Sequence, residues 1–562
     1  MLAQSPTMFG IEPPPKRPRL DQPPQPSQPH SRSHSQSHSA EFLAETTGAE
    51  ERASSPPANT RPPEPSTTSN PDLFHSSPGS WYQDGFSQDP GFLASQEELR
   101  AILFTLANSA APTRASSPEA GKRASELDLG ASASPSTTVS RAYNHHQHYQ
   151  EQRRTATTSR SPLSSRRRVE YLKNYVAEIA PWLDMFDSNC TFRQQLPALS
   201  HSFPALLYAI LAISARQMER KSGIQGWCDS LELYQEAIRL LSPLIQVRDP
   251  KIVAACVLLC CLEMMSARAQ DWHRHLEGCA ALFEASGIHG FCGGLLQAVF
   301  WCYARMDLCG ALISDGTRTT VLHPSKWLPV GCQEEDAYSL FKEARTPDMH
   351  ANYAVYLAVK TTELVSNRTK FIELGEANGC TAEVFPARWA SLWDELQTWL
   401  AERPPELLPI QTIPQKPFPR ILFVHWAAIS SNQLYHTACI LLLKMMPKGL
   451  RMPRSPTLSL LWHARRICGI SISNKHQGCL NNAIQPLWIA GRLFSHASEH
   501  EQIVKTIRGI EAETGWGACW RIRDLELAWG YTVSGNRREM MNQQFSASMD
   551  GDAHQHQQHI VV

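Results

Sequence analysis

The chain has 562 residues, and its 53 basic and 53 acidic side chains leave a formal net charge of zero. Its length alone would suggest about four domains, at roughly 150 residues each, but the uneven composition argues against that division. Neutrality also argues against a protein whose whole surface attracts nucleic acid through positive charge.

The first part of the chain, residues 1–168, holds 21 of the 40 prolines and polar tracts such as SQPHSRSHSQSHS. A segment of this composition buries too little apolar area to offset its chain entropy. We therefore predict a long, mostly disordered N-terminal region. Near its start, PPPKRPRLD presents Lys16, Arg17 and Arg19 beside prolines. Such a run is typical of a nuclear import signal bound by an import receptor, and also of a solvated charge cluster.

One stretch inside this region has a helical pattern, and we predict a short helix at residues 95–107. Ser95 and Glu98 have the spacing of a capping box. Aliphatic side chains then recur on one helical face, which makes them candidates for docking to a partner or to the protein's own body. They are Leu99, Ile102, Leu103 and Leu106.

A second basic stretch precedes the apolar part of the chain. Between Arg141 and Arg168 there are seven arginines and one acidic residue. Arg166, Arg167 and Arg168 are therefore further import candidates. A stretch of this kind can also contact phosphates without reading bases, or act as a solvated linker.

Long apolar segments with helical periodicity occupy residues 169–533, for which we predict an all-α, irregular multi-helix regulatory domain. Asp249 and Pro250 mark one helix start, and Asp271 and Gly287 mark the two ends of the next helix. Pro181 is expected to limit the first helix of the body. Further helices are expected at 291–309, 351–366, 387–402, 421–446, 456–470, 486–496, 499–512 and 518–530. Residues 534–562, rich in Gln and His, are expected to be disordered.

The cysteines were considered as metal ligands. Cys256, Cys260 and Cys261 share one apolar segment, with His273 and His275 soon after. Structural zinc sites usually place paired ligands on short turns, so we interpret these thiols as core residues. Cys302 and Cys309 receive the same interpretation. We therefore predict no metal ligand among them.

Catalytic and membrane signatures are missing from the sequence. It contains no phosphate-binding G-x-x-x-x-G-K-[ST] loop, no H-E-x-x-H and no G-x-S-x-G elbow. The longest apolar runs, FPALLYAILAI and IVAACVLLCCL, are shorter than the about 20 residues that span a bilayer. We predict neither an enzyme nor a membrane protein, and no cofactor in this chain.

Three long blocks nevertheless resemble a known family. YLKNYVAEIAPWLDMFD, LPALSHSFPALLYAILAISARQMERK and IRGIEAETGWGACWRIRDLELAWGY are similar to the fungal-specific transcription factor domain of binuclear zinc cluster regulators. SQEELRAILFTLANSAAPTRASSP resembles a segment upstream of that domain in some members. The resemblance covers roughly residues 90–531 and implies a nuclear regulator of transcription by RNA polymerase II.

The resemblance has one clear departure. Family members carry an N-terminal cluster beginning C-x2-C-x6-C, in which six thiolates hold two zinc ions and present a helix to DNA. The first cysteine here is Cys190, inside the predicted body. DNA contact would then come from a cluster missing from this chain or from a partner regulator.

The resemblance therefore leaves three hypotheses open. The protein is a regulator whose helical body responds to a partner or effector, a co-regulator that dimerises with a DNA-binding relative or with itself, or a helical enzyme without a recognisable motif. Inspection of the DNA upstream of Met1 would separate the first two.

Overall fold

The computed structural model describes residues 85–110, 164–223, 228–244, 249–267, 269–314 and 316–531. The chain divides into two units, Met1–Ser76 and Ser77–Val562, and every described residue belongs to the second. Of the regions predicted to be mostly disordered, 1–168 and 534–562, the structure describes only 85–110 and 164–168, the latter at the start of a helix, and Lys16, Arg17 and Arg19 lie outside the described residues.

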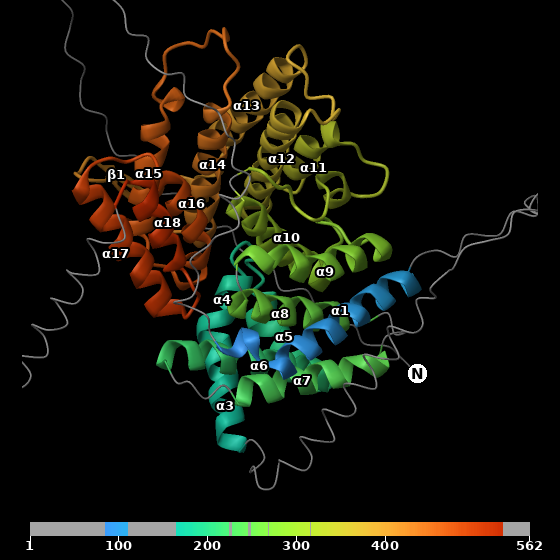
Figure 1. The fold of residues 1–562 in the computed structure, drawn as a ribbon. Coiled ribbons are helices and arrows are strands. Elements are labelled where there is room, and N and C mark those ends of the chain that lie inside the picture. The colour runs from blue at the N-terminus through green and yellow to red at the C-terminus, as the bar shows by residue number, and fades with distance from the viewer. Residues whose placement is uncertain are drawn as a thin grey trace, which may run out of the picture. The chain divides into compact units, whose positions relative to one another are not determined.

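Helices dominate the described part of the chain (Figure 1), which confirms the all-α prediction. The first nine labelled helices are α1 (Pro90–Ala110), α3 (Ser165–Asn174), α4 (Ala180–Leu183), α5 (Leu196–Ser200), α6 (Pro204–Ser222), α7 (Cys228–Leu241), α8 (Pro250–Ser266), α9 (Trp272–Ser286) and α10 (Gly294–Ile313). They are followed by α11 (Ala337–Glu343), α12 (Pro347–Leu374), α13 (Phe385–Ala401), α14 (Trp426–Lys444), α15 (Leu460–Ser473), α16 (Ile484–Gly491), α17 (Ala497–Thr514) and α18 (Trp520–Ala528). None of the described helices is both long and apolar enough to span a bilayer.

The ends of α8 and α9 follow from local chemistry. Asp249 caps α8, because its side chain accepts a hydrogen bond from the backbone N–H of Lys251 at 2.9 Å, and Pro250 occupies the first turn. Gly287 ends α9 in the left-handed conformation, with φ at 64°. Asp271 does not cap α9 as predicted, because it belongs to a short 3₁₀ turn and makes no capping hydrogen bond.

The prediction that Pro181 ends the first helix of the body is also corrected. After α3, residues Tyr175–Ile179 form a π-helical turn, and Ala180 donates its N–H to the carbonyl of Tyr175. Pro181 then lies in the first turn of α4, where its missing N–H costs no helical hydrogen bond. The chain therefore continues as helix through the proline.

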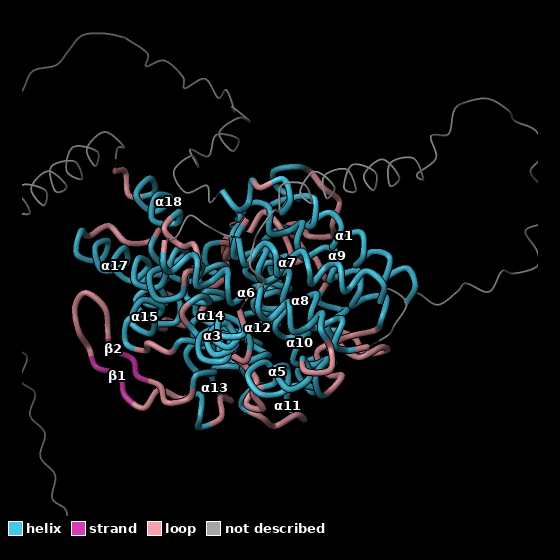
Figure 2. Tube along the Cα trace, turned by 90° about the horizontal axis from the view of Figure 1, so that it is seen from below, coloured by secondary structure: helices cyan, strands magenta, loops and turns pink. Residues whose placement is uncertain are grey.

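A short hairpin was also missed. Strands β1 (Gln411–Ile413) and β2 (Arg420–Leu422) pair antiparallel, with Thr412 opposite Ile421. The helix predicted to begin at residue 421 begins at Trp426 instead. The hairpin lies at the edge of the helical assembly in Figure 2. It covers one end of α15, and Ile421 is buried there.

Two groups of helices form the core. In the first, α6 packs against α7 and α8; in the second, α14 lies between α12 and α15. In α14 every residue from 427 to 442 is buried. This explains why residues that are polar in sequence, such as Gln433 and Thr437, lie inside the protein and hydrogen-bond there.

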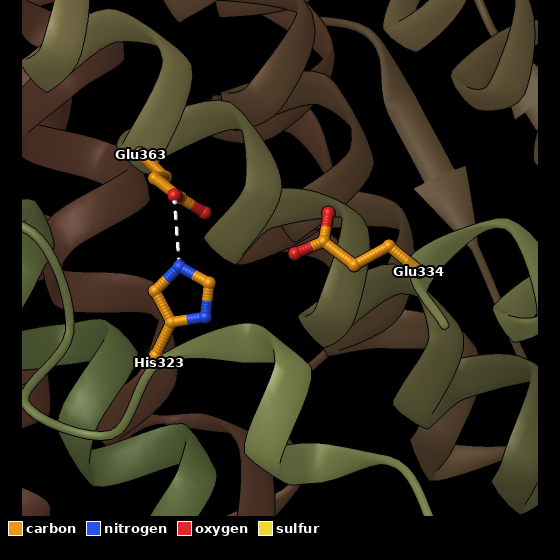
Figure 3. A group of neighbouring side chains, drawn as sticks. All are labelled: His323, Glu334 and Glu363. Atoms are coloured by element: carbon orange, nitrogen blue, oxygen red, sulfur yellow. Dashed lines mark hydrogen bonds and ion pairs between the residues drawn. The ribbon is translucent and has the colours of Figure 1, made fainter. Parts of the chain in front are cut away.

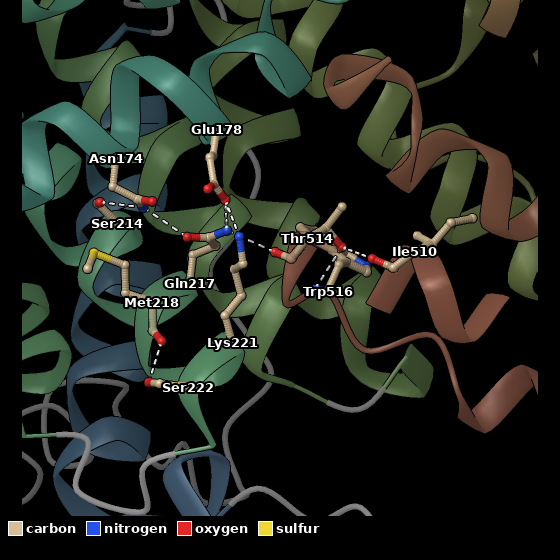
Figure 4. Close-up of polar contacts among 10 residues, drawn as sticks. All are labelled: Asn174, Glu178, Ser214, Gln217, Met218, Lys221, Ser222, Ile510, Thr514 and Trp516. Carbon is tan, nitrogen blue, oxygen red and sulfur yellow. Dashed lines mark hydrogen bonds and ion pairs between the residues drawn. The ribbon is translucent and has the colours of Figure 1, made fainter. Parts of the chain in front are cut away.

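The two ends of the body meet in a polar junction (Figure 4). Gln217 of α6 donates to Glu178 at 2.8 Å and to the carbonyl of Thr514, at the end of α17, at 3.2 Å. Asn174 donates to the side-chain oxygen of Gln217 at 2.8 Å. The junction ties the blocks at residues 171–187, 196–221 and 507–531 into one body, since all three contribute to it.

Candidate interaction site

Helix α1 lies along α9 and also contacts α7 and α8, as Figure 1 shows in blue against green. It is longer than the predicted 95–107 and begins differently. Asp89 accepts hydrogen bonds from the backbone N–H groups of Gly91 at 2.7 Å and Phe92 at 3.2 Å. The expected Ser95–Glu98 capping box is not formed, because Ser95 lies inside the helix and donates to the carbonyl of Gly91. Asp89 therefore supplies the start that the sequence analysis assigned to Ser95.

The apolar face predicted for docking is buried in the protein itself. The exposed fractions are 2% for Leu99, 3% for Ile102, 3% for Leu103 and 7% for Leu106. Of the two alternatives, a separate partner or the protein's own body, the structure shows the second. These four residues are not available to another protein while α1 is docked.

A glycine on α9 allows the close approach of α1. A Cβ added at Gly278 would lie 2.7 Å from Cδ1 and 2.9 Å from Cβ of Leu103. Non-bonded carbon atoms do not approach each other so closely, so any larger residue at position 278 would displace the Leu103 side chain. The contact is therefore shaped for this pair of residues.

Aromatic side chains fix the N-terminal end of α1. The rings of Phe86 and Phe92 lie 4.7 Å apart, and Phe92 lies 5.4 Å from the ring of Tyr234 on α7. The guanidinium of Arg216 on α6 lies 4.0 Å from the centre of the Phe86 ring. This cation–π contact is largely shielded from water, since both residues are buried.

Two ion pairs line the rim of the same contact. Arg100 pairs with Glu277, and Arg274 pairs with Glu97 at 3.2 Å. The side chains of the second pair are each 61% exposed, so this pair is screened by solvent and contributes little. The pairs set the direction and register of α1 on α9, because reversing the helix would place like charges together.

A polar cluster lies beneath the centre of α1. Nδ1 of His275 lies 2.9 Å from Oε2 of Glu263 and 3.0 Å from Nε2 of Gln96, and Tyr234 donates to the other oxygen of Glu263. Burial and the neighbouring Glu263 carboxyl raise the pKa of Tyr234 well above its usual value, so the phenol stays protonated as a donor. A cavity of about 140 Å³ adjoins the cluster, lined by Gln96 and Arg100 on one side and by Glu263, His275 and Gly278 on the other.

Four of the five thiols considered as metal ligands lie in the core, and the fifth, Cys309, is half-buried against it. Cys256, Cys260, Cys261 and Cys302 are at most 3% exposed. Burial raises the pKa of Cys256 and Cys261 well above 9, which opposes the thiolate form that binds zinc. Their environment is that of small hydrophobic side chains.

His323, Glu334 and Glu363 form a further cluster of possible metal ligands, which was not predicted from the sequence (Figure 3). Their ligand atoms lie within 4.8 Å of one another, and Nε2 of His323 is 3.1 Å from Glu363. The hydrogen bond with Glu363 raises the pKa of His323. Since Ser325 donates its N–H to Nδ1, the neutral ring carries its proton on Nε2. A divalent cation here would have to displace that proton. The three residues are far apart in sequence, so no sequence motif predicts the cluster.

The arginines predicted for import lie on the first turn of α3 and are exposed. Arg166 pairs with Glu170 at 3.1 Å, and Arg167 pairs with Asp229 of α7 at 2.6 Å. Arg168 lies over the ring of Tyr208. An import receptor would therefore compete with these intramolecular contacts for at least two of the three side chains.

Comparison with known proteins finds a family match in one region of the body. Residues 170–372 match the fungal specific transcription factor domain. The transcription activator AMTR1 of Alternaria alternata is 23% identical over 348 residues, which cover 50% of this chain and 44% of that protein. The chain thus spans less than half the length of this relative. No solved structure matches it. The matched residues 170–372 include α7, α8 and α9 but not α1.

Proposed function

We propose that the protein is a nuclear regulator of transcription by RNA polymerase II, because residues 170–372 match the fungal specific transcription factor domain. The helical body is its regulatory and partner-binding module. The single observation that carries the proposal is the family match over α3–α12, and the similarity to a transcription activator supports it. The body acts by contact with other molecules and not by catalysis.

DNA contact has two possible sources, and different experiments test them. In the first, a six-cysteine zinc cluster beyond the printed residues reads DNA; in the second, a partner regulator supplies the contact. Both sources lie outside residues 1–189 of this chain, which contain no cysteine. The cysteines of α8 cannot serve instead, since they are buried among apolar side chains.

Chromatin immunoprecipitation of the tagged native protein tests the role. We expect enrichment at promoters and altered transcription of the adjacent genes when the protein is deleted. If enrichment is lost when a co-purifying zinc cluster regulator is removed, the protein is a co-regulator. An absence of promoter enrichment in every growth condition would contradict both forms of the proposal.

Nuclear entry is tested separately. We propose that Lys16, Arg17 and Arg19 form the import signal and that Arg166–Arg168 assist it. Alanine substitution of the first three should shift a fluorescent fusion to the cytoplasm. The matched control replaces Arg52, Arg61 and Arg114, which lie outside both basic runs. Equal nuclear fractions for the variant and the control would contradict the assignment.

A further inference from the structure

Helix α1 is attached to the body through one face only. Leu93 and Phe104, on its opposite side, are 44% and 38% exposed. The helix is joined to α3 by residues 111–163, and its main contacts are with α7, α8 and α9. Its departure would therefore break one surface and leave the contacts among the other helices in place.

The surface beneath α1 is specific for one helix. Gly278 and the two ion pairs select one helix in one register. The Arg274–Glu97 pair is solvent-screened, and a polar cluster and a cavity of about 140 Å³ lie beside the buried aliphatic side chains of the contact. Water entering on separation would hydrate Glu263 and His275, which offsets part of the cost of exposing the leucines.

We propose that the face formed by α7, α8 and α9 is a helix-binding groove and that α1 is its tethered, removable occupant. When α1 leaves, the groove binds α1 of a second copy of the chain, the one helix whose complementarity to this surface the contacts demonstrate. The inference rests on these contacts and does not depend on the proposed function.

The tether determines which helix occupies the groove. Because α1 belongs to the same chain as the groove, it is held there at an effective concentration on the order of 1 mM. Exchange between copies is therefore rare in dilute solution and rises when copies are held side by side. A regulator gathered at neighbouring sites would meet that condition.

A peptide of residues 85–110 is the probe for the groove. In the full chain carrying Leu99→Glu and Leu103→Glu, α1 cannot dock, because two charges would be buried without partners. We expect a fluorescent peptide to bind this variant about 100-fold more tightly than the wild-type chain, whose groove is occupied. Adding Gly278→Leu should abolish binding. Leu93→Glu with Phe104→Glu is the matched control on the exposed face and should behave as wild type.

A second measurement covers the case in which the double variant does not fold. A protease site placed between residues 111 and 163 allows the wild-type chain to be cut after folding. We expect the fragment that contains α1 to separate from the body on dilution to nanomolar concentration, with the body retaining its helical content. Co-elution at every dilution, or unfolding of the body on separation, would overturn the proposal. So would a folded double variant that fails to bind the peptide.

Discussion

Helices α1 and α14 both bury apolar side chains, yet the protein uses them in opposite ways. Helix α14 is buried along its length from residue 427 to 442, between α12 and α15. Helix α1 buries one face and leaves Leu93 and Phe104 exposed on the other. The difference teaches that burial of a leucine does not by itself make a helix part of the core. What matters is how many sides of the helix would have to be unpacked to remove it.

The largest effect is expected in the core around α14. Trp389 of α13 is fully buried and donates its indole N–H to the carbonyl of Leu442 at 2.8 Å. Trp389→Ala should lower the free energy of unfolding by about 3–5 kcal/mol, because it leaves a cavity and an unpaired carbonyl. Chemical denaturation measures this. Val384→Ala, at a site 46% exposed, is the control; an equal loss in both variants would contradict the core assignment.

Acid should weaken the α14–α15 contact. Nδ1 of His436 lies 2.8 Å from Nδ1 of His463, whose Nε2 donates to the carbonyl of Thr457. Burial lowers the pKa of His436 far below 6.5, and the positive charges of Arg466 and Arg403 lower it further. Burial also lowers the pKa of His463 to about 4, with a further contribution from the charge of Arg466. The unfolded chain therefore binds more protons between pH 6.5 and pH 4.

It follows that the contribution of this pair to stability is fully present above about pH 6.5 and is lost as the pH is lowered through this window, by about 3 kcal/mol for His463 alone. Denaturation midpoints measured across the range check the slope. A chain with both His436→Leu and His463→Leu should lose this contribution, so the stability difference between wild type and variant should change between pH 6.5 and pH 4 in favour of the variant. A difference that is constant across the window would contradict the buried, neutral pair.

Truncation of a buried side chain in α1 should destabilise the docking of α1 and not the global fold. Leu103→Ala removes a side chain that is 3% exposed, at a typical cost of about 2–3 kcal/mol. Because α1 leaves alone, the loss should appear as about 30- to 150-fold faster amide exchange in residues 90–110, with little change in the midpoint of global unfolding. Phe104→Ala, on the exposed face, is the control. A lower global midpoint for Leu103→Ala would place α1 in the core.

The smallest effect is expected at the rim. Glu97→Gln removes the charge that pairs with Arg274 and should weaken α1 docking by about 0.2–1 kcal/mol at low salt. The difference from wild type should vanish in about 1 M salt, where charges are screened within a few ångströms. Exchange rates of α1 at two ionic strengths provide the measurement. A loss that persists at high salt would show that Glu97 acts through packing.

The sequence was most informative where local chemistry decides structure. Asp249 with Pro250 and Gly287 act as predicted, because capping and the left-handed glycine depend on neighbouring backbone groups. It was least informative where tertiary contacts decide. The helical pattern of α1 was visible, but the residues that receive it, such as Gly278, lie far along the chain and carry no local signal.

The same limit explains the errors. Ser95 has the spacing of a cap, but Asp89 starts the helix earlier, and the aromatic anchors of residues 86–92 hold it there. His323 and Glu363 meet only because a loop returns to α12. Fold class could be inferred from periodicity, whereas the candidate site required knowledge of which surfaces meet.

Native-state hydrogen exchange of α1 and α14 in the same unmodified sample tests the central claim most directly. The account predicts that amides of residues 90–110 exchange through an opening of α1 alone, with a lower free energy and a weaker dependence on denaturant than global unfolding. Amides of residues 427–442 should exchange only with global unfolding. Equal opening free energies for the two helices, with the same dependence on denaturant, would contradict a removable α1.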